Sequence, residues 1–595
     1  MINMAKTIND LRQGKYQKII AHMRSAKTCS LEDQVALIGA HCFLGQMEQA
    51  FELWRVHETS LHGDNRIYAQ FFLGIALTRI SKFKKARVFL KANLLEAVSP
   101  SALSFAYQGA GFYSYFQGNF KQAIGWSQKA LHQSLKAKEN YIEFLAMDLL
   151  GHTVVQTGRR FEGLRLMKEA NRLALLNGNN NFSAAFNNAQ LIYEAEIGLR
   201  APTIMTELQE ALNHPKLADS YTHSNLILEL SRQMTLRGQF EKAKTLLNFE
   251  ASAIYSFGNK RQEMMLQLRL AEISYHQGEF HLMNHLLQSA KKTVDRLADK
   301  AFEIRLLGLW LKIPQDISMS SGGPEKERLL AISKEHSSLI NRQILFRQGL
   351  ATDPKTPIGE DPIHDLFCLA KTYPELAQEK CLTLGHLGIY RHVAGLFPGN
   401  EFLKVMDNGE SFIAGSKEEI YHIKVSLSLQ QLKLLQGLTY TNATKEYLIE
   451  TVWGYAYDPL RHDSLIHNAI GKLRKILGPV ASWIVTTDTG WLWNKKIQLL
   501  IDLPEFSSPQ TSAKEGRDNE NYSTFFPDDL NFRQLKALKT APQDSGWSVG
   551  AYKKSFSIST MTAFRDLTHL HQKGLVIRTG KGRACRYLLR KEAQL

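Results

Sequence analysis

The sequence predicts a mainly α-helical protein in which a solenoid of helical repeats precedes two small α+β domains. Three observations predict this fold class. Glycines recur every 40 residues in the N-terminal half, a strand-like alternation of apolar residues begins at Phe402, and a second helix and hairpin pattern follows an acidic segment that ends at Asp529. A chain of 595 residues, 44% of them hydrophobic, exceeds what one hydrophobic core holds, so we expect several folded domains.

The helical repeats are most visible at their turns. Five glycines stand 40 residues apart, namely Gly118, Gly158, Gly198, Gly238 and Gly278. A left-handed glycine can end the first helix of each repeat, and the phenylalanine two residues later can pack back onto that helix, as at Phe120, Phe240 and Phe280. Alanines five residues after the glycine, Ala123 and Ala243, leave room for close helix packing. The pattern resembles tetratricopeptide-like repeats over about residues 28–299, in an array predicted to span residues 1–312.

Each repeat buries its apolar face only against its neighbours, so we expect a superhelix whose concave wall is the binding surface. Tyrosines in such repeats are more often packing residues than ligand contacts. We therefore expect inter-repeat packing for five of them, Tyr113, Tyr115, Tyr193, Tyr255 and Tyr275. The periodicity fades past Asp299, and residues 313–400 are predicted to be a helical connector.

Residues 401–500 are predicted to form a second domain. Asn408-Gly409 and Ala414-Gly415 break an alternating segment into hairpins, which indicates a small antiparallel sheet. Three helices are expected over residues 427–440, 444–454 and 462–478, followed by a hairpin over 482–494. This order closely resembles the OmpR/PhoB-type winged-helix family. The residues that carry the resemblance are Leu448, Val452, Trp453 and Gly454, then Ile470, Leu473, Arg474, Lys475 and Leu477, and in the wing Ile484, Thr486, Gly490 and Trp491.

The third helix of this domain is the candidate recognition helix. Leu465, Ala469, Leu473 and Leu477 recur at every fourth residue and are predicted to face the core. The predicted DNA-binding residues are Ser464, His467, Asn468, Gly471, Lys472, Arg474 and Lys475. Asn and Lys side chains can donate to base edges and phosphates in the major groove. The other interpretation is an ordinary solvated helix face. The wing carries Asp488 and Thr489 where the family usually places an arginine.

The end of the chain is predicted to be a second winged helix, residues 530–595, after an acidic flexible linker at 501–529. It resembles small DeoR-like and Fic-tail winged helices through Thr562-Ala563-Phe564-Arg565-Asp566-Leu567. Ser559 is a predicted N-cap, and Ala563, Leu567 and Leu570 are predicted to face the core. The candidate DNA-binding residues are Ser559, Thr560, Met561 and Arg565 on the helix, and Arg578, Lys581 and Arg583 in the wing.

Charge points to a polyanionic partner. The chain has 73 Lys and Arg against 57 Asp and Glu, a net charge of +16. The excess is concentrated at the end: residues 530–595 carry 13 basic and 3 acidic side chains, whereas 401–500 carry 11 and 10. No nucleotide-binding, protease or hydrolase motif is present, and the five cysteines and twenty histidines show no metal-ligand spacing. We therefore expect no enzyme activity, no metal and no cofactor.

The function that these patterns favour is a bacterial, sequence-specific DNA-binding transcriptional regulator. Its expected partners are double-stranded DNA and, on the repeats, a protein or peptide signal, with RNA polymerase a further candidate. The alternative is a non-enzymatic interaction scaffold whose winged helices contact proteins. No stretch approaches the roughly 18 uncharged apolar residues of a membrane helix, and charged Lys6, Asp10 and Arg12 stand where a signal peptide would be apolar. We expect a cytoplasmic protein without a membrane partner.

Overall fold

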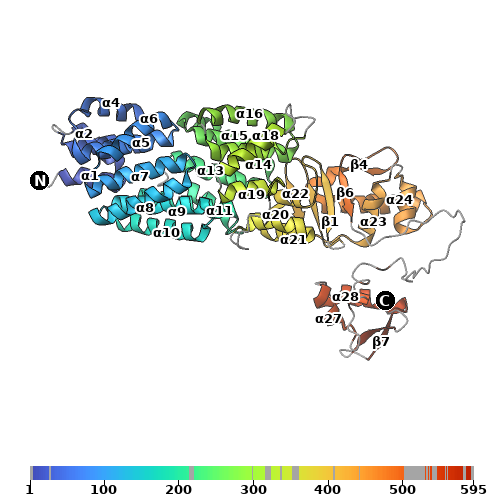
Figure 1. The fold of residues 1–595 in the computed structure, drawn as a ribbon. Coiled ribbons are helices and arrows are strands. Elements are labelled where there is room, and N and C mark those ends of the chain that lie inside the picture. Colours follow the sequence, from blue (N-terminus) through green and yellow to red (C-terminus); the bar gives the residue numbers. More distant parts are fainter. Residues whose placement is uncertain are drawn as a thin grey trace. The chain divides into compact units, whose positions relative to one another are not determined.

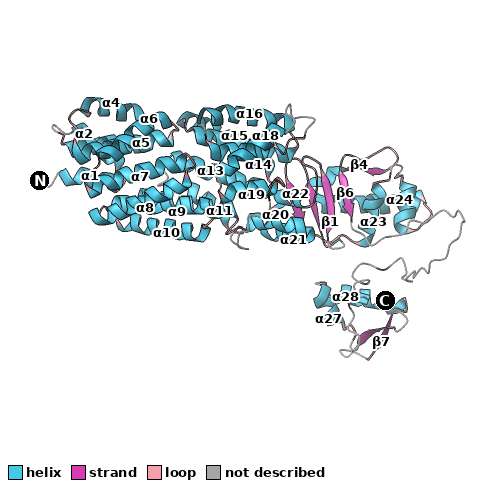
Figure 2. Cartoon of the chain, in the orientation of Figure 1, coloured by secondary structure: helices cyan, strands magenta, loops and turns pink. Residues whose placement is uncertain are grey.

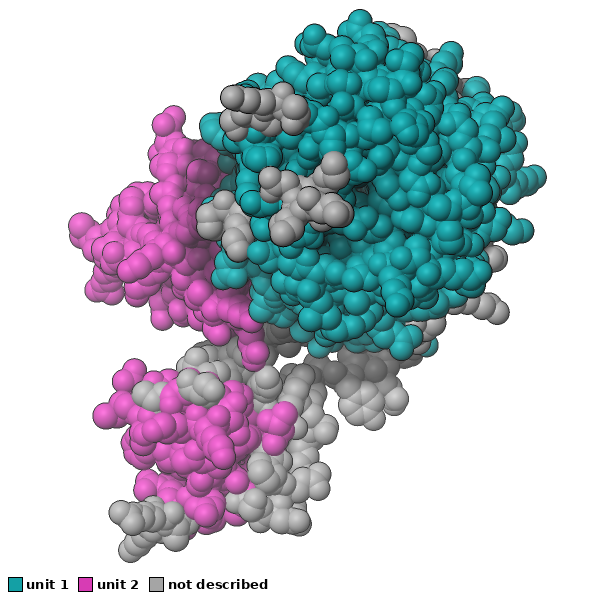
Figure 3. All heavy atoms as spheres, turned by 90° about the vertical axis from the view of Figure 1, so that its left-hand side faces the viewer, with its two compact units in different colours: residues 1–400, 416–420 teal, residues 401–415, 421–595 magenta. Residues whose placement is uncertain are grey.

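A computed structural model describes residues 4–25, 29–213, 220–297, 299–314, 323–335, 338–351, 361–406, 409–440, 443–501, 530, 534, 537–538, 540, 546–556, 558, 560–580 and 585–590. The chain divides into two compact units, residues 1–400 with 416–420, and residues 401–415 with 421–595 (Figures 1 and 3). We call them unit 1 and unit 2. Helices dominate both, and all strands among the described residues lie after residue 401 (Figure 2).

Unit 1 is built from pairs of packed helices. Its helices are α1 (Met4–Arg12), α2 (Tyr16–Ser25), α3 (Leu31–Phe43), α4 (Met47–His57), α5 (Gly63–Arg79), α6 (Phe83–Glu96), α7 (Pro100–Phe116), α8 (Phe120–Ala137), α9 (Asn140–Thr157), α10 (Arg160–Leu176), α11 (Asn180–Ile197), α12 (Ile204–Leu212), α13 (Ser220–Leu236), α14 (Phe240–Phe257), α15 (Lys260–Gln277), α16 (Phe280–Leu297), α17 (Lys300–Trp310), α18 (Gly323–Glu335), α19 (Leu339–Arg347), α20 (Pro362–Thr372), α21 (Pro374–Leu384) and α22 (Leu387–Val393).

The predicted turn chemistry is confirmed. All five glycines have positive φ, from 74° at Gly118 to 106° at Gly158. Residues that carry a Cβ rarely adopt this backbone conformation. The second helices α8, α14 and α16 begin at Phe120, Phe240 and Phe280, two residues after the glycine. Each repeat is therefore a helix, a glycine turn and a second helix.

Residues from distant parts of unit 1 pack against the glycine turns. A Cβ at Gly158 would meet Leu339 at 3.3 Å, and one at Gly198 would meet Ile363 at 2.8 Å. The predicted connector thus packs onto the repeats, within the same compact unit. Arg160 and Asp361 form an ion pair at 2.8 Å in which each side chain is only 4% exposed.

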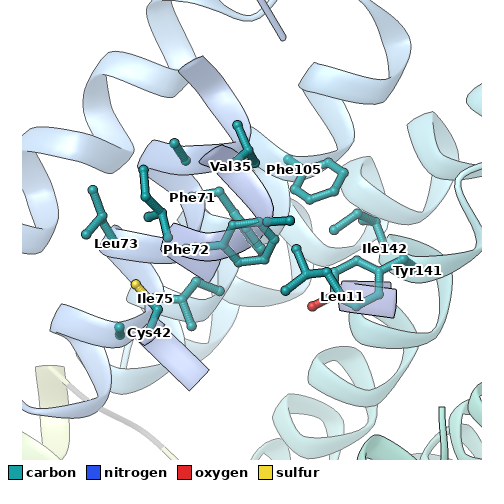
Figure 4. Packing of buried hydrophobic residues seen from close by; sticks show 14 of the residues in the cluster. Leu11, Val35, Cys42, Phe71, Phe72, Leu73, Ile75, Phe105, Tyr141 and Ile142 are labelled. Carbon is teal, nitrogen blue, oxygen red and sulfur yellow. The ribbon is translucent and has the colours of Figure 1, made fainter. Parts of the chain in front are cut away.

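The beginning of unit 1 is joined to later repeats in the same way. Arg12 of α1 reaches Glu139, 127 residues later, at 2.5 Å. Beside this contact lies an aromatic core in which Phe71, Phe105 and Tyr141 pack with Leu11 (Figure 4). These contacts bring successive turns of the superhelix together.

The first part of unit 2 contains a sheet, three helices and a hairpin. The sheet consists of β1 (Phe402–Met406), β2 (Ser411–Gly415), β3 (Ile420–Ile423) and β6 (Gln498–Ile501), in the order β3-β2-β1-β6. The helices are α23 (Leu429–Leu438), α24 (Lys445–Trp453) and α25 (Pro459–Leu477), and a short 3-10 helix η2 (Gly478–Trp483) precedes the hairpin of β4 (Ile484–Thr486) and β5 (Trp491–Trp493). The predicted order is confirmed. The sequence analysis missed β6, which pairs parallel to β1.

The last part of unit 2 contains α27 (Val549–Phe556), α28 (Thr560–Gln572) and a hairpin of β7 (Val576–Thr579) and β8 (Arg586–Leu589). Its core includes the predicted Ala563, Leu567 and Leu570, together with Tyr552 and Tyr587. The predicted linker lies outside the described residues except for Ile501, and so do most of residues 530–541 at the start of the predicted second winged helix.

Among the described residues, no helix is long and apolar enough to cross a membrane. All five cysteines are among the described residues, and none of them forms a disulfide there.

Candidate functional site

Unit 1 contains a cavity of about 380 Å³ on the concave side of the repeats. Its lining residues come from the first helix of successive repeats, α3, α5, α7, α9, α11, α13, α15 and α17, with Phe120 at the start of α8 as the exception. Apart from Phe120, no described residue of the second helices lines this cavity. The volume falls within the range of about 300–1,000 Å³ that is typical of small-molecule sites.

The cavity lining changes character along the array. Because the repeat is 40 residues long, residues at this spacing occupy equivalent places on successive first helices. One such series that lines the cavity is Leu149, Ala189, Glu229 and Arg269, and another is Phe116, Gln156 and Glu196. Early repeats therefore contribute apolar side chains where later repeats contribute charged ones.

The apolar end is a wall of aromatic rings. Phe43 packs edge to face with Phe182 at 5.7 Å between ring centroids, and Phe112 lies 4.7 Å from Phe116. The Arg79 guanidinium lies over Phe43 and Phe112, at 5.7 and 5.9 Å from their centroids. Aromatic rings and a cation over their faces offer a large apolar contact area.

A hydrogen-bond network crosses the middle of the cavity. The Tyr193 hydroxyl lies 2.9 Å from the Tyr115 hydroxyl and 3.2 Å from His152 Nδ1, and it accepts a hydrogen bond from Gln156 Nε2 at 3.1 Å. Burial, together with Tyr115, raises the pKa of Tyr193 well above its ordinary value, so this hydroxyl stays protonated. Tyr115 and Tyr193 join repeats, as predicted, and also line the cavity.

The other three tyrosines lie elsewhere. Tyr113 packs edge to face with Phe83, and the Lys312 ammonium lies 4.9 Å from the centroid of the Tyr275 ring. The packing prediction is wrong for Tyr255, whose side chain is 46% exposed. Tyr255 stands two residues before the end of α14.

The charged end of the cavity brings arginines and carboxylates together. Arg305 contacts Glu196 at 3.4 Å, and Arg269 contacts Glu272 at 3.2 Å. Burial opposes ionisation of Glu196, but the surrounding arginines, Arg305 first, outweigh it and lower the pKa of this carboxyl group. The opposite holds for Arg269, where burial lowers the pKa of the guanidinium. The sequence analysis missed this cluster because its members lie up to 109 residues apart.

The predicted recognition helix α25 presents one polar side. Ser464, His467, Asn468, Gly471, Lys472 and Lys475 are exposed. The opposite side is buried through Ile466, Ile470, Leu473 and Leu477. Leu465 and Ala469 pack against the same core, as predicted, but at its edge, where they are only half-buried. The helix has 3.6 residues per turn, so its buried stripe drifts away from a strict spacing of four.

Two predicted DNA-binding residues of α25 have contacts within the domain. Arg474 is half-buried, and its Nη2 donates to the Ile484 carbonyl oxygen and to Thr486 Oγ1, both at 2.8 Å. This arginine ties the helix to β4 of the hairpin. The His467 ring packs edge to face with Trp491, 4.7 Å between centroids. The exposed polar row therefore sits beside the hairpin.

Helix α28 has a similar arrangement. Thr560, Met561 and Arg565 are exposed while Ala563, Leu567 and Leu570 are buried. Arg578 on β7 is exposed, and its Nε lies 3.2 Å from Cys585 Sγ. The predicted residues Ser559, Lys581 and Arg583 lie outside the described residues.

No protein-family model matches this chain, and no curated protein matches it in sequence. A solved structure of a Rap protein complexed with competence and sporulation factor is similar over 61% of this chain and 96% of that one, at 12% sequence identity and a TM-score of 0.42.

Proposed function

We propose that this chain is a bacterial, sequence-specific DNA-binding transcriptional regulator whose helical repeats bind a protein or peptide signal. In this proposal residues 401–500 form an OmpR/PhoB-type winged helix-turn-helix domain and residues 530–595 a second one. No catalytic step is part of the proposal. The observation that carries it is the exposed polar row of α25, on a helix whose other side is built into a core and whose end is bonded to a hairpin.

The chemistry of this row suits the major groove. The groove admits one α-helix, and the side chains on its outer face can then reach base edges. Asn468 can bind an adenine edge through its amide, and Gly471, beside which a Cβ would meet nothing within 4 Å, allows the backbone to approach the DNA closely. Lys472 and Lys475 are placed to contact a base edge or the phosphates.

The second domain supplies the charge that the first one lacks. Residues 401–500 are nearly neutral, so they gain little from the release of counterions, whereas residues 530–595 have a net charge of +10. We infer that α25 selects the sequence and that the terminal domain supplies affinity. The cavity in unit 1 supports the other half of the proposal, because it offers a partly aromatic site for a small portion of a signal molecule.

Charge reversal on α25 tests the proposal. The full-length chain is mixed with a pool of random-sequence DNA duplexes, and bound sequences are selected and enriched at several salt concentrations. We expect one sequence family to emerge for the native chain and for a control variant with Lys495→Glu and Lys496→Glu, two exposed lysines between β5 and β6. A variant with Lys472→Glu and Lys475→Glu has the same net charge and should lose that enrichment.

Each result favours one function. If the native chain enriches no sequence and shows no salt-dependent binding, the DNA-binding proposal is wrong. The scaffold function, in which the winged helices contact proteins, is then favoured. If both variants lose enrichment equally, general charge and not the exposed row of α25 accounts for the binding.

A further inference from the structure

The ligand of the cavity can be inferred from the cavity itself. The two ends of the lining differ in chemistry, because the two series of equivalent positions begin with apolar Phe116 of α7 and Leu149 of α9 and end with charged Glu196 of α11 and Arg269 of α15. A ligand that fills both ends must therefore have an apolar part and a charged part. The sign of that charge depends on which cavity-lining groups already have partners.

The carboxylates at the charged end have partners. Both oxygens of Glu229 accept from Arg232 Nε, at 3.1 and 3.2 Å, and one of them also accepts from Gln233. Glu196 lies among several arginines, which hold it ionised. A cationic ligand group would have to compete with these arginines for each carboxylate.

The arginines at this end have fewer hydrogen-bond acceptors among the described residues than they have N–H donors. Arg305 has one ion pair among the described residues, the 3.4 Å contact with Glu196, which is long for a charge-assisted hydrogen bond. Arg269 Nε is buried and has no hydrogen-bond acceptor in the part of the chain that the structure describes. Both guanidinium groups line the cavity on the neighbouring first helices α15 and α17.

The surroundings add positive charge. Burial lowers the pKa of Arg269, the carboxylate of Glu272 raises it, and the positive charge of Arg305 lowers it further. Lys312 and Arg347 are further cations close to Glu272. The guanidinium groups of Arg269 and Arg305 each have one carboxylate partner among the described residues and five N–H donors, so an anion that bridges the two can accept hydrogen bonds from both. A carboxylate fits because its two oxygens can accept from a guanidinium fork.

We propose that the cavity binds a carboxylate attached to an aromatic or similarly large apolar group, with the carboxylate between Arg269 and Arg305 and the apolar group against the phenylalanine wall. This inference rests on the proposed role of the repeats as the signal-binding part. The same chemistry is found in a small aromatic acid and in the C-terminal residue of a peptide.

Matched probes test the sign of the charge. The full-length chain, without DNA, is titrated by calorimetry with 3-phenylpropionate, 3-phenylpropanamide and 3-phenylpropylamine, which share one ring and differ in charge. We expect the acid to bind at least about tenfold tighter than the amide, the ratio that one charged hydrogen bond typically supplies. Equal affinities, tighter binding of the amine, or no binding of the acid would overturn the proposal.

Two variants and a control locate the site. Arg305→Gln keeps a polar side chain of similar length and should abolish the preference for the acid over the amide, and Arg269→Gln should do the same if the variant folds. Arg172→Gln removes an exposed arginine of α10 that does not line the cavity, and should leave the preference unchanged. A preference that survives in both cavity variants contradicts the assignment.

A peptide pair distinguishes the two sources of the ligand. The tetrapeptide Ala-Ala-Ala-Phe with a free C-terminus is compared with its C-terminal amide and with 3-phenylpropionate. Tighter binding of the free peptide than of the small acid indicates a peptide signal, and the reverse indicates a metabolite. DNA binding is measured separately on the same protein, so a failed titration leaves the DNA-binding proposal standing and a failed DNA selection leaves the cavity proposal standing.

Discussion

The cavity wall of unit 1 and the exposed side of α25 are both made of polar side chains on helices, but they meet water differently. In the cavity, Arg269 and Tyr193 are enclosed, and their hydrogen bonds form within the protein. On α25, Asn468 and Lys472 are exposed, so their hydrogen-bonding groups face solvent. Buried polar groups stabilise the fold only while they are paired, whereas exposed ones can be changed with little effect on folding. Substitutions of buried residues in unit 1 should therefore alter stability, and those on the exposed side of α25 should alter binding alone.

The largest effect is expected at the buried pair of Arg160 and Asp361. Arg160→Ala removes the ion-pair partner of the buried Asp361 carboxylate, and a loss of about 3–5 kcal/mol in the free energy of unfolding is expected. Urea unfolding followed by far-ultraviolet circular dichroism measures this loss. The control Arg172→Ala removes an exposed partner of Glu169 in the same helix, α10, and should not move the midpoint. Similar midpoints for the two variants would contradict the expectation that a buried ion pair contributes more to stability than an exposed one.

The next effect is expected at a glycine turn. Gly238→Val places a β-branched side chain at φ 80°, which costs about 1–3 kcal/mol in backbone strain, and its Cβ would lie 2.9 Å from Ile420. Gly258→Val is the control, because Gly258 has a similar φ of 72° but nothing within 4 Å of a Cβ. We expect both variants to melt at lower temperature than the native chain and Gly238→Val to be the less stable. Equal losses would mean that the contact with Ile420 contributes nothing.

On α25 the expected effect is on DNA affinity and not on stability. Replacing Asn468 or Lys472 by Ala removes a proposed base contact, so binding to a selected site should weaken by about 1–3 kcal/mol with little change on scrambled DNA. Fluorescence anisotropy on both duplexes measures this difference, and a melting curve checks that the fold is unchanged. Equal weakening on both duplexes would assign these residues to the phosphates.

The smallest effect is expected in the terminal wing. Lys581→Ala with Arg583→Ala removes two charges, so binding should weaken about equally on every sequence and the slope of affinity against salt should shrink by about one to two. Titrations at three salt concentrations give the slope. If this variant loses discrimination between sites while the α25 variants keep it, the roles of the two domains are reversed.

Local patterns in the sequence were sufficient for much of the fold. The 40-residue spacing of glycines predicted the turns because a left-handed residue is a local requirement of the chain. The exposed row of α25 followed from helical periodicity, although the strict spacing of four placed Leu465 and Ala469 too deep. The strand β6 was missed, since its pairing with β1 joins residues almost a hundred positions apart.

By itself, then, the sequence determined the repeat, its turns, the order of elements in residues 401–500 and the distribution of charge, all of which depend on neighbours along the chain. Only the tertiary structure decided what the cavity is made of. Arg305 meets Glu196, and Arg160 meets Asp361, because successive helix pairs wind into a superhelix and bring distant helices together. The angle between one repeat and the next determines which distant residues come into contact. That angle depends on the packing of many side chains at once and not on any local pattern.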